Sequence, residues 1–161
     1  MKLRRFFTVA TTLPALFLIK EVFLSSPSSA EISSSSSDAF EARFTDRTMR
    51  VDLFHTGGPK GETVALDRAV DDGPWAGSRT RLLDETNLGS NFFEVKDPKT
   101  NRVVFSRGYS SIFSEWEQTE EARRAARTFP ESLRFPWPRE KVRIVLERRD
   151  KENVFHEVFS R

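Results

Sequence analysis

Short runs of alternating hydrophobic and polar residues dominate the chain from Phe40 onward. Met49, Val51 and Leu53 alternate with charged residues, which gives an extended strand one apolar face. Turn-forming residues recur about every ten positions, and no long segment has helical periodicity. This pattern predicts an all-β domain over residues 40–161, an antiparallel β-sandwich of jelly-roll-like type with one short helix.

The clearest predicted unit is a β-hairpin from Phe92 to Ser106. Its two apolar runs flank DPKTN at 97–101, where proline fixes φ and the Asp and Asn side chains can bond to the turn backbone. A second pair of strands is predicted at 142–146 and 154–159. The segment 129–138 contains three prolines, so we expect any strand there to lie at a sheet edge.

Two segments rich in glycine and proline are predicted to be loops. They are HTGGPKGE at His55–Glu62 and DDGPWAG at Asp71–Gly77, with a short strand candidate at Thr63–Leu66 between them. The helix is predicted after Thr119, which can N-cap the sequence EEARRAAR. Its glutamates suit the positive end of the helix dipole and its arginines the negative end, and Pro130 would end it.

Residues 1–30 have the three parts of a secretory signal peptide. Basic residues precede the apolar run Phe6–Ile19, and small residues lead to Ala30. As a helix this run would reach about 21 Å, short of the roughly 30 Å of a bilayer core, which disfavours the alternative of an uncleaved anchor. We expect cleavage after Ala30, a Ser-rich linker at 31–39, a secreted, periplasmic or cell-surface protein, and no integral membrane segment after cleavage.

Removing the predicted signal peptide changes the charge of the chain. The full sequence has 26 Lys and Arg against 24 Asp and Glu, a net charge of +2. Four of the basic and one of the acidic side chains lie in residues 1–30, so 22 and 23 remain and the net charge becomes −1. A nucleic-acid partner requires a basic surplus on the protein, and we therefore predict no such partner.

The residue types that carry most catalytic chemistry are scarce. There is no cysteine, which excludes disulfides, thiolate metal sites and a Cys nucleophile. His156 begins an H-E-x-x-H match, but Ser160 stands in the fifth place. His55 could serve as a base or ligand in a loop, although a structural role is favoured. A Ca²⁺ site at Asp71 and Asp72 is a weak alternative, because the spacing matches no calcium loop. No catalytic residue, metal ligand or cofactor is predicted.

The three tryptophans, Trp75, Trp116 and Trp137, lie in or beside predicted loops. Exposed loop aromatics can stack on a sugar or on a protein partner, so these residues are the candidate binding surface. The alternative, packing in the core and at the corners of the sandwich, is favoured because aromatic side chains dominate burial in small domains.

Five long segments carry a resemblance to a known family. In chain order they are FTDRTMRVDLFHTG (44–57), PWAGSRTRLLD (74–84), SRGYSSIFSEWEQTEEA (106–122), TFPESLRFPWP (128–138) and VRIVLERRD (142–150). Together they resemble the N-terminal domain of the secreted IgA-peptidase-type zinc metallopeptidases. The resemblance implies a β-sandwich placed ahead of a catalytic domain, and it is that following domain which carries H-E-x-x-H in the family. No catalytic residue is carried over to this chain.

These observations predict a non-catalytic, exported module. It would support or orient a metallopeptidase catalytic domain, or contact a protein or glycan. The alternative is a free-standing secreted module that binds carbohydrate or protein. An enzyme in its own right is disfavoured, because none of the site signatures is complete.

Overall fold

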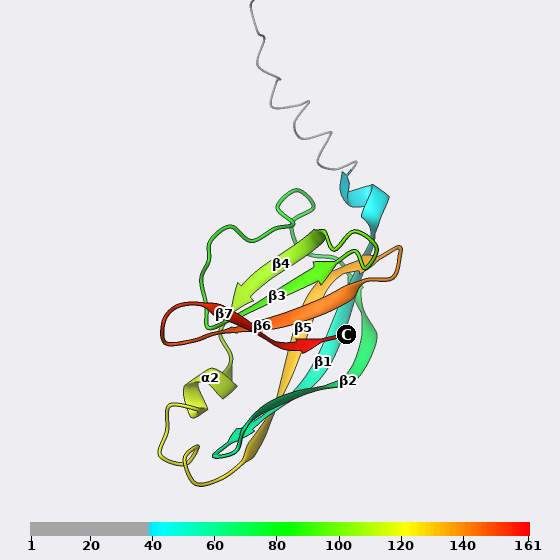
Figure 1. Ribbon diagram of the computed structural model, residues 1–161. Helices are drawn as coiled ribbons and strands as arrows, with labels where there is room; N and C mark the ends of the chain where they lie inside the picture. Colours follow the sequence, from blue (N-terminus) through cyan, green and yellow to red (C-terminus); the bar gives the residue numbers. More distant parts are fainter. Residues whose placement is uncertain (1–38) are drawn as a thin grey trace, which may run out of the picture.

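The computed structural model describes residues 39–161, most of which form two antiparallel sheets (Figure 1). The three-stranded sheet has the order β2-β1-β5, with β1 at Phe44–Gly58, β2 at Gly61–Pro74 and β5 at Arg127–Pro138. The four-stranded sheet has the order β4-β3-β6-β7, with β3 at Asn91–Lys96, β4 at Val103–Tyr109, β6 at Arg143–Arg149 and β7 at Phe155–Ser160. The short helix α2 spans Ile112–Trp116, and a helical turn at 39–43 precedes β1. The predicted all-β, two-sheet architecture is confirmed.

The predicted signal peptide and nearly all of the predicted linker lie outside the described residues, and both stay predictions. Within residues 39–161, no helix has the length and hydrophobicity needed to cross a bilayer.

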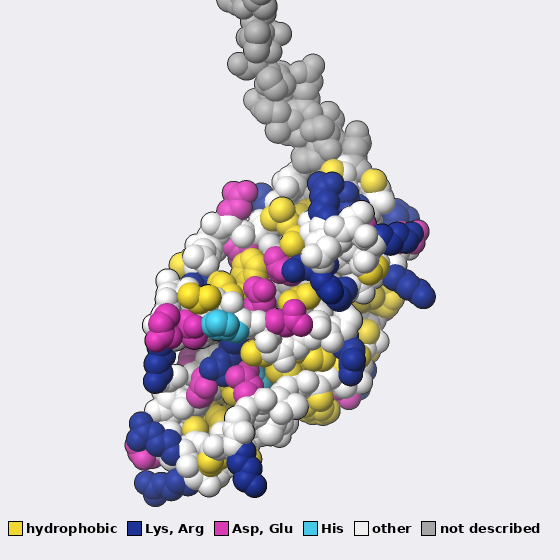
Figure 2. Space-filling view, in the orientation of Figure 1, with side chains coloured by type: hydrophobic (Ala, Val, Ile, Leu, Met, Phe, Trp, Pro, Cys, Tyr) yellow, Lys and Arg dark blue, Asp and Glu magenta, His cyan; other side chains and the backbone are white. Residues whose placement is uncertain are grey.

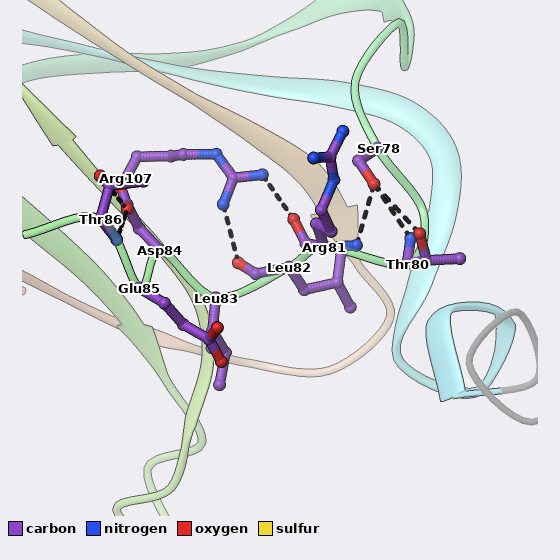
Figure 3. Close-up of a pocket in the computed structure, with 9 residues that line it drawn as sticks. All are labelled: Ser78, Thr80, Arg81, Leu82, Leu83, Asp84, Glu85, Thr86 and Arg107. Atoms are coloured by element: carbon purple, nitrogen blue, oxygen red, sulfur yellow. Dashed lines mark hydrogen bonds between the residues drawn. The ribbon is translucent and has the colours of Figure 1, made fainter. Parts of the chain in front are cut away.

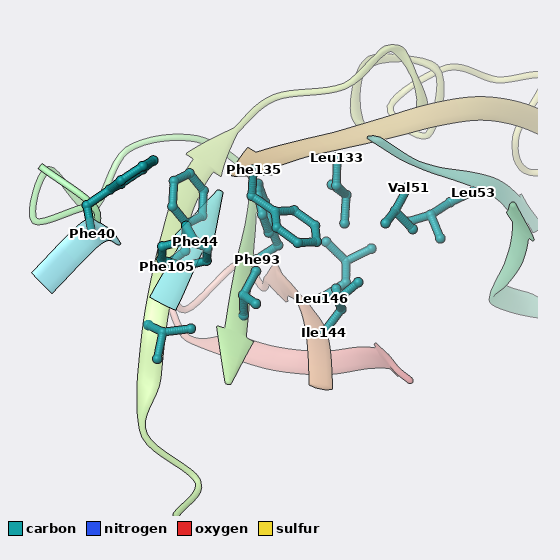
Figure 4. Close-up of a cluster of buried hydrophobic side chains, with 12 residues drawn as sticks. Phe40, Phe44, Val51, Leu53, Phe93, Phe105, Leu133, Phe135, Ile144 and Leu146 are labelled. Carbon is teal, nitrogen blue, oxygen red and sulfur yellow. The ribbon is translucent and has the colours of Figure 1, made fainter. Parts of the chain in front are cut away.

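A hydrophobic core lies between the two sheets (Figure 4). On β1, Val51 and Leu53 are buried, as their alternation predicts. Three phenylalanines from both sheets meet at the centre, with ring centroids 5.9–6.3 Å apart. They are Phe93, Phe105 and Phe135. Full burial of one such side chain is worth about 1.5–3 kcal/mol, so this aromatic contact is a main source of adhesion between the sheets.

The two predicted strand pairs are present. In the turn between β3 and β4, Asn101 donates its amide to the Asp97 carbonyl at 2.8 Å and has a φ of 58°. Strands β6 and β7 pair antiparallel, as the second pair predicted. Strand β5 pairs only with β1 and is therefore an edge strand, which agrees with its three prolines.

Both predicted glycine-rich loops are wrong. Strand β1 continues through His55 to Gly58, and β2 begins at Gly61, so that only a tight turn separates them. The second segment is mostly strand, because β2 runs on to Pro74. Gly57 pairs in the ladder on both sides, and a Cβ added there would lie 2.5 Å from the Phe113 ring. Glycine is required at this position by close packing, not by a turn.

The helix also forms elsewhere than predicted. The segment after Thr119 makes only hydrogen-bonded turns, whereas α2 begins after Ser111, whose side chain accepts the Ser114 amide. An isolated helix of a few residues is unstable unless it buries an apolar face. EEARRAAR has only alanines to bury, while α2 buries Phe113 and Trp116. Burial therefore outweighs the favourable charge pattern.

Candidate functional site

On the inner faces of four strands, an apolar side chain is followed by a polar one. The change occurs at nearly the same level in neighbouring strands. Each change is a single two-residue step along the strand, so it exchanges one inward side chain for the next. Below the phenylalanine core, the space between the sheets therefore has a polar end. The steps are Leu53 to His55 on β1, Leu133 to Glu131 on β5, Phe93 to Asn91 on β3 and Leu146 to Arg148 on β6.

His55 lies at the centre of this polar end and is fully buried. Its Nδ1 is 3.0 Å from Glu131 Oε1, and its Nε2 is 2.6 Å from Glu62 Oε1. The Phe113 ring of α2 stacks on the imidazole, with centroids 3.6 Å apart and planes 16° apart. Both ring nitrogens are thus engaged by carboxylates and one face is covered by an aromatic ring.

Two side chains of the four-stranded sheet complete the network. Tyr109 donates its hydroxyl to Glu131 Oε2 at 3.0 Å, and Arg148 donates to Glu62 Oε2. Arg148 also donates to Glu117 Oε1 at 2.7 Å, and its guanidinium lies over the Phe113 ring. The bonds to Glu131 and Glu62 run from one sheet to the other. The polar end therefore connects the sheets through directional contacts, whereas the core connects them through buried apolar area.

The surroundings of each group set its protonation state. Burial disfavours the charged form of His55, but its hydrogen bonds with Glu131 and Glu62 outweigh burial and raise the pKa of the imidazole. Burial likewise disfavours the Glu131 carboxylate, yet bonds from His55, Ser111 and Tyr109 leave its pKa lowered. The pKa of Tyr109 is raised, first by burial and then by the nearby Glu131 charge. These shifts favour the protonated form of His55 and the ionised form of Glu131, with the Tyr109 hydroxyl as a donor.

The polar atoms of this network face one another inside the domain. A general base or a metal ligand needs a lone pair that its target can reach, whereas both ring nitrogens of the buried His55 already face carboxylate oxygens. Within residues 39–161, no group of three or more His, Cys, Asp or Glu side chains is placed to hold a metal ion. The side chains of this network connect the two sheets through hydrogen bonds inside the domain.

The network could have been found from the sequence. The inward alternation that gives Val51 and Leu53 continues to His55 with the same two-residue step. On β5, the step from Phe135 to Leu133 leads on to Glu131. Treating His55–Glu62 as a loop hid this continuation. Tyr109 and Arg148 come from distant strands, and only the pairing of the sheets brings them in.

The other sequence candidates lie apart from the polar end. His156 is exposed on β7, with Nε2 2.5 Å from Asp150 Oδ2. Asp71 accepts two bonds from Arg47, and Asp72 accepts bonds from Arg134 and Arg50. These arginine contacts lower the pKa of both aspartates. The oxygens that a Ca²⁺ ion would use are therefore occupied by guanidinium groups.

The three tryptophans do not share an aromatic contact in the described part of the chain. Trp116 is buried against Phe113 and Phe129 beneath the polar end. Trp75 is half-buried, and its ring meets the Phe105 ring edge-on, with the ring centroids 5.9 Å apart. Trp137 is half-buried on β5. Trp116 has no face available for stacking on a ligand.

A surface hollow of about 630 Å³ lies where residues 78–86 cross the edge of β4 (Figure 3). Arg107 points along it and donates to the carbonyls of Leu82 and Arg81, at 3.1 and 2.7 Å. Its side chain also covers the Phe105 ring, and burial lowers the pKa of the guanidinium. The polar groups of the hollow are thus used to fasten the 78–86 segment to the sheet.

Charges of both signs are spread over the outside of the domain. Figure 2 shows Lys and Arg interspersed with Asp and Glu across the visible face, without a continuous basic field. This distribution accords with the near-neutral charge calculated for residues 31–161. The absence of a nucleic-acid partner stays a prediction.

Comparison with known proteins places the domain in a family. A search of curated proteins found no match. A protein-family model described as Peptidase M64 N-terminus matches residues 39–160, a range that contains α2 and all seven strands of the two sheets. The resemblance to the N-terminal domain of IgA-peptidase-type metallopeptidases is confirmed by this match. The chain belongs to the Peptidase M64 N-terminus family.

Proposed function

We propose that this domain is a non-catalytic, exported module that supports or orients the catalytic domain of a peptidase. The observation that carries the proposal is the match to a peptidase N-terminus over residues 39–160. The polar end adds support, because its titratable side chains are bonded to one another inside the sandwich and present no free base. The basic, apolar and small-residue segments of residues 1–30 support the proposal of export.

The non-catalytic role is tested with the full chain, a protein substrate and added zinc. We expect cleavage no faster than in the buffer control. Turnover that a zinc chelator abolishes would overturn the proposal.

The supporting role needs a second measurement, on a Peptidase M64 catalytic domain from the same genome. We expect the present chain to raise the thermal midpoint or the kcat/KM of that domain when both are mixed or fused. Equal midpoints and equal kcat/KM with and without the chain would count against a supporting role. Mass spectrometry of the exported protein tests the leader, and the expected new N-terminus is Glu31.

A further inference from the structure

Three of the four outer strands of the two sheets are protected against pairing with another chain. At β4, residues 81–84 cover the edge: Ser106 donates its amide to the Leu82 carbonyl at 3.0 Å, and Gly108 donates to Asp84 at 2.7 Å. Strand β5 carries three prolines, and β7 has only six residues. Proline, short length and a covering segment are the usual means by which an exposed sheet edge is kept from associating.

Within residues 39–161, strand β2 has no covering segment and no internal proline, and it is not short, although it carries charged side chains and two register shifts against β1. It is 14 residues long, and its one proline is the last residue, Pro74. In the described part of the chain its only hydrogen-bonded strand neighbour is β1, while β7 of the other sheet lies close to it without pairing. No strand lies beyond it on its outer side in Figure 1. The five residues from Ala65 to Ala69 are all exposed, and Leu66 is 46% exposed although it lies on the inner face with Leu53. An open edge on which apolar side chains flank a charged pair is a surface for another strand.

The middle of β2 is complementary to itself in the antiparallel direction. Reading ALDRAV from 65 to 70 against its own reverse places Asp67 opposite Arg68, Leu66 opposite Ala69 and Ala65 opposite Val70. In a regular strand, such a match would put facing residues on opposite sides of the sheet, because side chains alternate.

A register shift in β2 removes this conflict. Arg68 pairs with Asp52 and Leu66 pairs with Leu53, so Asp67 is an extra residue in β2. Because Asp52 points outward and Leu53 inward, Arg68 and Leu66 point to opposite sides of the sheet. Asp67 lies on the side of Arg68, with Oδ2 3.6 Å from Nε. Each residue and its facing copy then share a side.

We propose that β2 pairs antiparallel with β2 of a second copy of this chain, about a two-fold axis between Asp67 and Arg68. Two charge pairs, each between Asp67 of one copy and Arg68 of the other, then lie on the outer side. Leu66 packs against Ala69 of the partner subunit on the inner side. The same patch serves both copies, as a closed two-fold interface requires. This association goes beyond the proposed function and does not depend on it.

The pairing is expected to be weak and sensitive to salt. One strand pair buries less than a standard interface of about 1,600 Å², so the dimer forms in a concentration-dependent equilibrium. The charge pairs are exposed, and their attraction is screened as ionic strength rises. Sedimentation of the full chain over about 10 µM to 1 mM is therefore expected to show monomer and dimer, with less dimer at high salt.

The proposal is tested most directly by reversing the charge at one of the two facing positions, Asp67 or Arg68. Asp67→Arg places only Arg at the two facing positions, and Arg68→Asp places only Asp. We expect each variant alone to have a dissociation constant at least about tenfold higher than the unchanged chain, since like charges face each other directly. An equimolar mixture of the two restores both opposite pairs and is expected to form heterodimers. Recovery on mixing also shows that neither variant has failed to fold.

Leu66→Lys tests the inner side of the same pair and is expected to abolish the dimer. Leu88→Lys is the matched control, because Leu88 is 68% exposed and lies outside β2, in the loop before β3. This variant is expected to dimerise as the unchanged chain does. A chain that stays monomeric to the highest concentration would overturn the proposal. Dimers that survive the single charge reversals, or variants that do not recover on mixing, would overturn it too. A monomer whose binding to a peptidase domain is lost on Leu66→Lys would assign the edge to that domain instead.

Discussion

The apolar and polar ends of the space between the sheets lie on neighbouring parts of the same strands, two residues apart, yet they hold the sheets together in different ways. At the apolar end, Phe93, Phe105 and Phe135 contribute through buried area and close packing, which is largely non-directional. At the polar end, His55 and Glu131 contribute through bonds whose partners must all be present. An apolar core tolerates substitutions that conserve volume, whereas a buried polar network is harmed by the loss of any one member.

The largest expected effect comes from emptying the apolar end. Phe135→Ala removes a fully buried ring that touches both Phe93 and Phe105, and we expect a loss of about 3–5 kcal/mol in the free energy of unfolding, measured in urea. Phe54→Ala is the control: Phe54 is on β1 but 44% exposed, so its loss is expected to stay within about 1 kcal/mol. Equal losses in the two variants would contradict the assignment of the core.

A smaller loss is expected when the polar end loses one charge without losing volume. Glu131→Gln keeps the shape of the side chain but cannot pair ionically with His55, and it turns one acceptor into a donor facing either His55 or Tyr109. We expect a loss of about 1–3 kcal/mol, read from the same urea titrations. Glu157→Gln, on the exposed side of β7, is the matched control and should change little. A neutral result for Glu131→Gln would mean that the network adds no stability.

The polar end should also make stability depend on pH in a way that the apolar end does not. The pKa of His55 is above its ordinary value of 6.5, so its contribution is complete below about pH 6.5 and is lost as pH rises through the folded pKa. The pKa of Glu131 is below its ordinary value of 4.5, so its contribution is present above that pH and is lost as pH falls through the folded pKa.

Between about pH 4.5 and 6.5 both contributions are present. Above pH 6.5 we expect the free energy of unfolding to fall by up to about 1.4 kcal/mol per pH unit, the slope for one proton. His55→Gln should lose this slope. An unchanged slope in His55→Gln would assign it to other groups.

The smallest effect on stability is expected for an exposed ion pair that belongs to neither the apolar nor the polar end. Arg47 and Asp71 form a two-bond ion pair, but both side chains are about half exposed. Exposed pairs contribute about 0–1 kcal/mol, so Arg47→Ala should shift the urea midpoint only slightly. A loss as large as that of Glu131→Gln would show that surface pairing matters here as much as the buried network.

How much of the fold could be predicted depended on whether the determining interactions were local. The hairpin around Asp97 and Asn101 was predictable, because its turn residues form the turn by themselves. The prolines of β5 likewise indicated an edge strand, since proline has no backbone N–H that it could donate to a neighbouring strand. Composition and alternation were sufficient for the two-sheet class.

The rest was decided by contacts between distant residues. Gly57 suggests a turn when read locally, but it is strand backbone that leaves room for Phe113. The charges of EEARRAAR favour a helix, yet burial of Phe113 and Trp116 places it a few residues earlier. The polar end could not be predicted while His55 was assigned to a loop and the helix was placed after Thr119. Its central contact can be inferred only when His55 is in a strand and α2 lies over it.

The stack of Phe113 on His55 has a consequence for motion as well as for stability. The ring closes one face of the imidazole, and α2 is a helix of only five residues held mainly by Phe113 and Trp116. A short element with so few anchors opens locally far more often than the whole domain unfolds. We expect the His55 ring protons to exchange with solvent when α2 lifts and the bonds to Glu131 and Glu62 break, so the rate of that exchange would report local opening of this end and not unfolding of the sandwich.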